Sequence, residues 1–113
     1  MDKVSKYRQL LKQILTRYVE LANRHPQPGV ESVLVIDEER DNYIWANVGW
    51  SQGERVDGTT FFGRIRDGKI WIEEDWTEDG IATDLLEVGV PKEDIVLAFH
   101  EPEMRQYTEF AVA

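Results

Sequence analysis

The chain has 113 residues, of which 42% are hydrophobic and 11% aromatic, and it carries a formal net charge of −9 and no cysteine. This length fits one domain, residues 1–113, and the apolar content suffices for a core without disulfide or metal staples. No stretch approaches the roughly 18 apolar residues of a membrane span, and the N-terminus lacks the apolar segment of a signal peptide. We therefore expect a cytoplasmic protein without membrane contact.

Residues 3–23 predict one long helix. Neither Gly nor Pro interrupts this segment, and Pro26, Pro28 and Gly29 follow it as stop signals. Its apolar residues recur at spacings of three and four, which is typical of a helix with one buried face. These residues are Val4, Tyr7, Leu11, Ile14, Leu15, Tyr18, Leu21 and Ala22.

From residue 32 the apolar period changes to two, which predicts strands over 32–37, 43–50, 55–66 and 69–75. Asp67-Gly68 is a hairpin signal, and Gly58 and Gly63 are candidate bulge or close-approach positions. Strands joined by such short turns imply an antiparallel meander.

Beyond the strands, Thr77 is the expected N-cap of a short helix that ends at Gly89. Its inward-facing residues would be Ile81, Leu85, Leu86 and Val88. Pro91 begins a further helical turn, 95–99 is a fifth strand or a core segment, and 102–113 form a terminal turn or helix. The predicted fold class is α+β: a long N-terminal helix packed on an antiparallel sheet of four to five strands, with short C-terminal helices.

Charge is divided unevenly along the chain. Residues 1–28 carry six basic and two acidic residues, a net charge of +4, whereas residues 29–113 carry seven basic and twenty acidic residues, a net charge of −13. The only basic stripe on the first helix is Lys6, Arg17 and Arg24, which is a poor footprint for phosphate. We expect no direct nucleic-acid binding by this chain alone.

The densest acidic cluster is formed by Glu73, Glu74, Asp75, Glu78 and Asp79. In an unbroken strand Glu73 and Asp75 point to one face, where two carboxylates can hold Mg²⁺ or share a proton. No Lys, His or third acid completes such a site, so a solvated strand end followed by acids at a helix N-terminus is favoured.

His25 and His100 are the only histidines and have no local metal-ligand partner. We predict no catalytic residue, metal ligand or cofactor.

Aromatic residues make two strands apolar on both faces. Tyr43 and Trp45 share one face of the second strand, and Trp50 lies on the other. On the fourth strand, Trp71 similarly lies on the face opposite to Ile70 and Ile72. One face must meet the helices. The other is covered by C-terminal segments, or it forms a homodimer or heteromer interface in which Trp and Tyr are favoured anchors.

Nearly the whole chain resembles the XisI family, the fdxN element excision controlling factors of cyanobacteria. The resemblance is strongest over 67–102 (DGKIWIEEDWTEDGIATDLLEVGVPKEDIVLAFHEP) and 105–113 (RQYTEFAVA), and it extends to 2–15 and 41–58. It implies an accessory role with an XisH-like partner protein, in support of a recombinase complex that excises a DNA element. The family has no established catalytic residues to transfer.

Three functional hypotheses follow. The first is a non-catalytic accessory protein that binds an XisH-like protein, the second an acidic inhibitor or antitoxin-like regulator of a nuclease-like XisH partner, and the third a metal-dependent enzyme using the acidic cluster. The first is favoured. The expected partner-binding residues are Trp45, Trp50, Trp76, Glu73, Asp75, Glu78 and Asp79.

Overall fold

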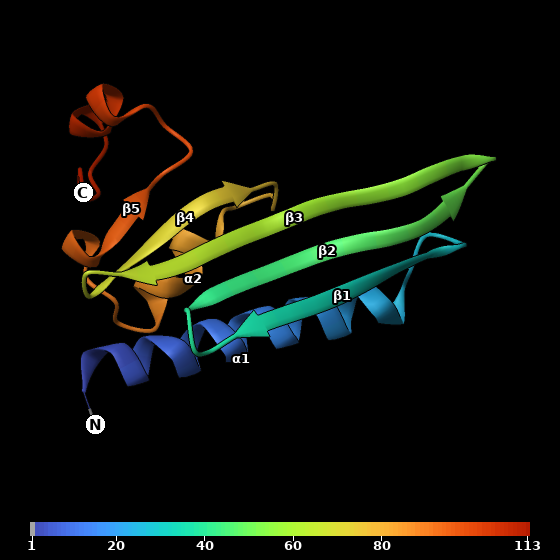
Figure 1. Ribbon diagram of the computed structural model, residues 1–113, viewed down its shortest axis with the longest axis horizontal. Helices are drawn as coiled ribbons and strands as arrows, with labels where there is room; N and C mark the ends of the chain where they lie inside the picture. The colour runs from blue at the N-terminus through green and yellow to red at the C-terminus, as the bar shows by residue number, and fades with distance from the viewer. Residues whose placement is uncertain (1) are drawn as a thin grey trace.

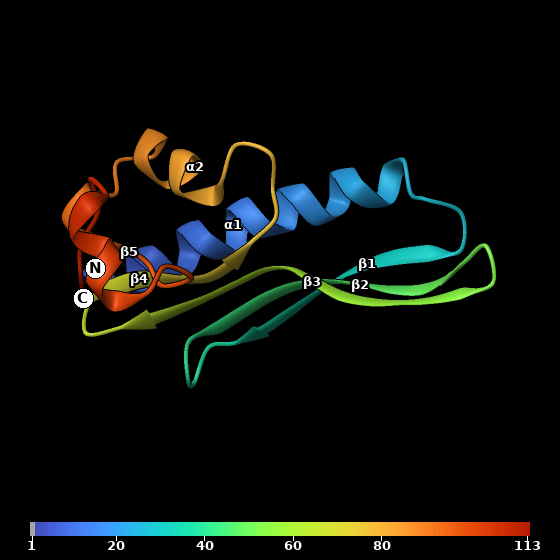
Figure 2. The same cartoon turned by 90° about the horizontal axis from the view of Figure 1, so that it is seen from above.

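The computed structural model describes residues 2–113 as one sheet with its two α-helices on the same face (Figures 1 and 2). The strands β1 to β4 form an antiparallel meander, and β5 pairs in parallel with β4 at the edge of the sheet. The elements are α1 (Lys3–Arg24), β1 (Val30–Asp37), β2 (Asn42–Ser51), β3 (Glu54–Arg66), β4 (Lys69–Asp75), α2 (Ile81–Glu87), η1 (Lys92–Asp94), β5 (Ile95–Leu97) and η2 (Pro102–Tyr107).

The predicted α+β class, the long first helix and the four-strand meander are confirmed. The sheet is mixed because α2 is a crossover that returns the chain to the starting end of β4, so that β5 must run parallel to it. None of the helices within residues 2–113 is long and apolar enough to cross a membrane.

The first helix supplies much of the core. The Asp2 carboxylate accepts a hydrogen bond from the Ser5 N–H at 2.8 Å and caps its N-terminus. The apolar stripe then lies against one face of the sheet. Its buried members are Tyr7, Leu11, Ile14, Leu15 and Val19. On the sheet they meet the buried residues Tyr43, Trp45, Phe61, Ile65, Ile70 and Ile72. The predicted stripe also includes Leu21, but this residue is 54% exposed and lies outside the buried contact.

Two irregularities break the alternation of the sheet. Thr60 is an extra residue of β3 opposite Trp45 and Ala46, and Glu73 is an extra residue of β4 opposite Phe62 and Gly63. The close approach predicted at Gly63 is confirmed, since a Cβ there would lie 2.7 Å from the Phe61 ring.

At Gly58 the bulge prediction is wrong. That glycine pairs regularly with Asn47, and a Cβ on it would meet nothing within 4 Å. The bulge forms two residues further on.

The C-terminal elements differ from the prediction in two details. The second helix starts at Ile81 and not at Thr77, because Asp75, at the end of β4, accepts a hydrogen bond from the Ile81 N–H at 2.7 Å. Thr77 therefore lies in the loop and is not the N-cap. Val88, expected to face inward, is 45% exposed at the C-cap, and Val90 is buried instead.

Three tyrosines connect α1 and β2 to carboxylates. The hydroxyl of Tyr7 donates to Asp94, and that of Tyr18 donates to Asp84 of α2 at 2.8 Å. Burial, and then this hydrogen bond, raise the pKa of Tyr18 to about 12. Burial also raises the pKa of Tyr7 and of Tyr43 above the ordinary value. Each tyrosine must therefore stay protonated in the folded state.

We expect stability to fall as the pH rises from about 10, where tyrosine ionises in the unfolded chain, to about 12, where Tyr18 ionises in the folded state. Tyr18→Phe should reduce this slope by up to about 1.4 kcal/mol per pH unit, the contribution of one proton. Urea unfolding monitored by circular dichroism at several pH values measures it. Below about pH 9 the free energy of unfolding of the two proteins should depend on pH in the same way. If the slope above that pH is the same in Tyr18→Phe as in the unchanged protein, the raised pKa of Tyr18 is contradicted.

Candidate partner-binding site

Trp45 belongs to the core. It is 9% exposed, and its ring stacks on Tyr18 of α1 with centroids 5.7 Å apart. The alternation of β2 turns Tyr43 and Trp45 toward the helices, as the sequence predicts for one of the two faces. The expectation that Trp45 takes part in partner binding is thereby corrected, because the helix occupies the surface that a partner would need.

Trp50 lies on the opposite face at the far end of the β2–β3 hairpin. It is 60% exposed, and the Arg55 guanidinium lies 5.7 Å from its ring centroid. This end of the molecule is remote from the C-terminal segments (Figure 1). Trp50 therefore belongs to a different surface from the acidic cluster.

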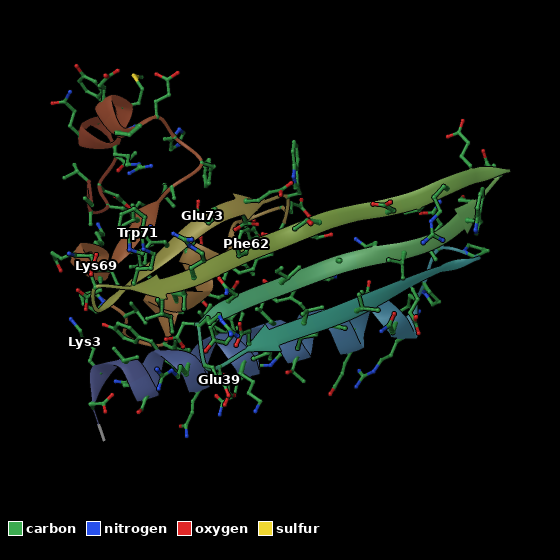
Figure 3. The ribbon with its side chains drawn as sticks, viewed as in Figure 1. Lys3, Glu39, Phe62, Lys69, Trp71 and Glu73 are labelled. Atoms are coloured by element: carbon green, nitrogen blue, oxygen red, sulfur yellow. The ribbon has the colours of Figure 1, made fainter. Side chains whose placement is uncertain are left out.

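The acidic cluster is divided by the bulge at Glu73. The Glu73 carboxylate lies 3.3 Å from the Arg64 Nε, on the sheet face away from the helices (Figure 3). That Arg64 nitrogen is buried and makes no well-directed hydrogen bond, so the contact is an ion pair only. Asp75, two residues later, caps α2 on the other face. The expected shared face of Glu73 and Asp75 is therefore wrong, because the extra residue reverses the alternation between them.

Both carboxylate oxygens of Asp75 accept hydrogen bonds from the loop that follows β4. One accepts from the N–H and the hydroxyl of Thr77 at 2.9 and 2.6 Å, and the other accepts from the Ile81 N–H at 2.7 Å. These bonds close the loop that carries Trp76, Glu78 and Asp79. Within residues 2–113, no three His, Asp or Glu side chains are placed to hold a metal ion.

This loop presents the most exposed tryptophan of the chain. Trp76 is 75% exposed, its N–H donates to the Thr60 carbonyl at 2.8 Å, and its indole nitrogen donates to Glu74 at 2.7 Å. Glu78 and Asp79 are exposed beside it. The predicted residues Trp76, Glu78 and Asp79 are therefore brought together at one end of β4.

Two adjoining hollows lie at this end of β4, and Trp76 lines the smaller of them. The smaller, about 240 Å³, is lined by Glu74, Asp75, Trp76 and Phe99. The larger, about 310 Å³, shares Asp75 and Phe99 with it and extends over apolar side chains that include Leu97. We call the two together the Trp76–Phe99 groove.

Phe99 and Glu74 also line this groove, although neither is among the partner-binding residues predicted from the sequence. The sequence predicts that Phe99 belongs to a fifth strand or a core segment, but β5 ends at Leu97 and Phe99 is 50% exposed. The apolar run 95–99 gave no sign of where burial stops, since that depends on the short length of pairing with β4. Glu74 belongs to the acidic cluster seen in the sequence, but its hydrogen bond with the Trp76 indole depends on the conformation of the loop that follows β4.

A second groove lies between α1 and α2. It has a volume of about 290 Å³ and is lined by residues that include Leu10, Arg17, Leu21, Asp84 and Val88. Its rim carries both signs of charge. Nothing about this groove defines the chemistry of an occupant.

The sheet face opposite the helices is covered only in part. At the β4 end the guanidinium groups of Arg66 and Arg105 lie 5.2 and 5.7 Å from the Trp71 ring centroid, so the C-terminal segment does shield this tryptophan. Over β1 to β3 no described segment lies on this face (Figure 2), and Val35 is 52% exposed. The homodimer or heteromer interface expected on this face stays a prediction.

The fold is a small α+β domain whose sheet carries helices on one face, with the exposed aromatic residues Trp76 and Phe99 beside one groove. The XisI protein family model matches residues 1–112, and the chain belongs to the XisI family.

Two solved structures from Anabaena variabilis are similar throughout their length. One is described as fdxN element excision controlling factor XisI, with 42% sequence identity, a TM-score of 0.87 and coverage of 99% of this chain and 100% of that one. The other is described as a XisI-like protein, with 40% identity, a TM-score of 0.89 and coverage of 97% and 99%. No curated protein matches the chain significantly.

Proposed function

We propose that this protein is a non-catalytic accessory factor in the control of DNA-element excision, and that it acts by binding an XisH-like protein. The observation that carries the proposal is the family match over residues 1–112, together with a full-length structural relative that is described as an excision controlling factor. The structure supports a binding role through its exposed aromatic residues: Trp50 at the end of β2, Trp76 in the loop after β4 and Phe99 in the turn after β5.

Co-expression with an XisH-like protein of the same organism tests the proposal. The tagged chain should retain the XisH-like protein through affinity and size-exclusion steps, in a complex of defined stoichiometry. Recombinase components, added to this complex, should then associate with it and not with the free chain. An XisH-like protein that elutes alone beside this chain would contradict the proposed function.

A second candidate function is an acidic, antitoxin-like inhibitor of a nuclease-like XisH partner. The charge of residues 29–113, with twenty acidic against seven basic residues, favours it, because such a surface can occupy a basic DNA-binding groove. A fluorescent DNA duplex bound by the XisH-like protein should then be displaced by this chain. Simultaneous binding of DNA and this chain would contradict competition while leaving the accessory role in place.

A further inference from the structure

Trp76 is exposed and yet held in place. Its backbone N–H bonds to the carbonyl of Thr60, the extra residue of β3, and its indole nitrogen bonds to Glu74. A large aromatic side chain that is already fixed loses little conformational freedom when a partner covers it. Trp76 therefore has the properties of an interface anchor and not those of a mobile surface residue.

Phe99 is fixed in a comparable way from the other side of the groove. The carbonyls of Ala98 and His100, which flank it, accept hydrogen bonds from the Arg105 guanidinium at 3.2 and 3.1 Å. The Ala98 N–H is bonded to Ile72 of β4 at 2.8 Å. The Phe99 ring packs on the His100 ring, with centroids 4.6 Å apart. Arg105 thus holds the backbone of an exposed phenylalanine.

The groove between these two rings has an acidic rim and an apolar floor. Glu74 lines the smaller hollow and Asp79 lines the larger one, whereas Asp75 is already used by its three hydrogen bonds. The other carboxylate of the larger hollow, Glu109, lies 3.3 Å from Lys92. Glu74 and Asp79 make no ion pair within residues 2–113, so no cation of the described chain neutralises their negative charge.

We infer that the Trp76–Phe99 groove binds a basic, amphipathic segment of a partner protein. An Arg or Lys of that segment lies over Trp76 and beside Glu74 and Asp79, where cation–π attraction and charge act together. A neighbouring aliphatic side chain enters the larger hollow. That hollow is lined in part by the apolar side chains of Ile72, Leu86 and Leu97, which suit contact with an aliphatic group. Phosphate groups are disfavoured by the same carboxylates.

The first experiment requires no knowledge of the partner. The ¹⁵N-labelled chain is titrated with the peptide acetyl-Arg-Leu-Arg-amide to about 10 mM, a range in which weak binding is detectable. The Trp76 indole N–H signal, assigned by its loss in Trp76→Ala, should shift, whereas the Trp50 indole signal should stay and acetyl-Glu-Leu-Glu-amide should have no effect. Equal shifts with both peptides, or none, overturn the inference. A Trp76 shift that depends on protein concentration alone identifies a second copy of this chain as occupant and also overturns it.

The second experiment uses the XisH-like protein, so that it rests on the proposed function. Trp76→Ala combined with Phe99→Ala should weaken the complex at least tenfold in calorimetry, whereas Trp50→Ala, the matched exposed tryptophan, should change the affinity less than about twofold. Asp79→Lys should weaken binding and reduce its salt dependence. Equal effects at Trp76 and Trp50 overturn the inference but not the proposed function. A peptide-induced Trp76 shift without any XisH binding supports the groove and contradicts the proposed function.

Discussion

Gly49→Ala is expected to lower the free energy of unfolding by about 3 kcal/mol, through backbone strain and overpacking. Gly49 has a φ of 146°, which side-chain-bearing residues rarely adopt, and a Cβ there would lie 1.9 Å from the Gly29 carbonyl oxygen. That oxygen already accepts a hydrogen bond from the Trp50 N–H at 3.0 Å, so neither backbone can move away without losing the pairing of β1 and β2.

Urea unfolding monitored by circular dichroism and tryptophan fluorescence measures this effect. Gly58→Ala is the matched control in the same sheet, because a Cβ at Gly58 has open space around it. It should leave stability unchanged or raise it by up to about 1 kcal/mol. Equal stability of the two alanine variants would show that β1 and β2 are not packed at Gly29 as described.

Asp75→Ala is expected to destabilise the protein by about 2 kcal/mol, because it leaves the N–H groups of Thr77 and Ile81 without their acceptor at a half-buried position. The loop that carries Trp76 should also become more mobile, which faster amide hydrogen exchange at Thr77 and Ile81 would report.

Asp79→Ala is the control for this variant. Asp79 is exposed in the same loop and uses only its backbone carbonyl, which accepts from the Thr83 hydroxyl at 3.0 Å. Its substitution should change stability by less than about 0.5 kcal/mol. Comparable destabilisation by the two changes would contradict the capping role of Asp75.

The contrast between these two aspartates affects how partner binding is interpreted. Both belong to the acidic cluster seen in the sequence. Asp75 accepts hydrogen bonds from the N–H groups of Thr77 and Ile81, whereas Asp79 is exposed to solvent. A loss of binding in Asp75→Ala would therefore reflect a disordered loop. Only Asp79, Glu74 and the aromatic residues of the groove report on direct contact.

Charge is also arranged differently in space from its order along the chain. The division into a basic N-terminal segment and an acidic remainder holds for the sequence. On the folded sheet, however, Arg64 pairs with Glu73, and the guanidinium groups of Arg66 and Arg105 flank Trp71. The sheet face opposite the helices thus has basic groups at its β4 end, while the Trp76–Phe99 groove carries carboxylates that are unpaired within residues 2–113.

Local patterns in the sequence determined the elements of this protein, because a period of three to four or of two reports which side of a helix or strand is buried. The long helix, the four-strand meander and the α+β class follow from patterns of this kind, whereas the resemblance to the XisI family comes from the likeness of long sequence stretches such as 67–102. The tertiary structure decided the details that depend on contacts between distant segments. The extra residue at Glu73 separated two carboxylates that alternation places together, and α1 covered Trp45 while leaving Trp50 exposed. Only the packing of β5 against β4, with Arg105 holding the segment that follows, placed Phe99 beside Trp76.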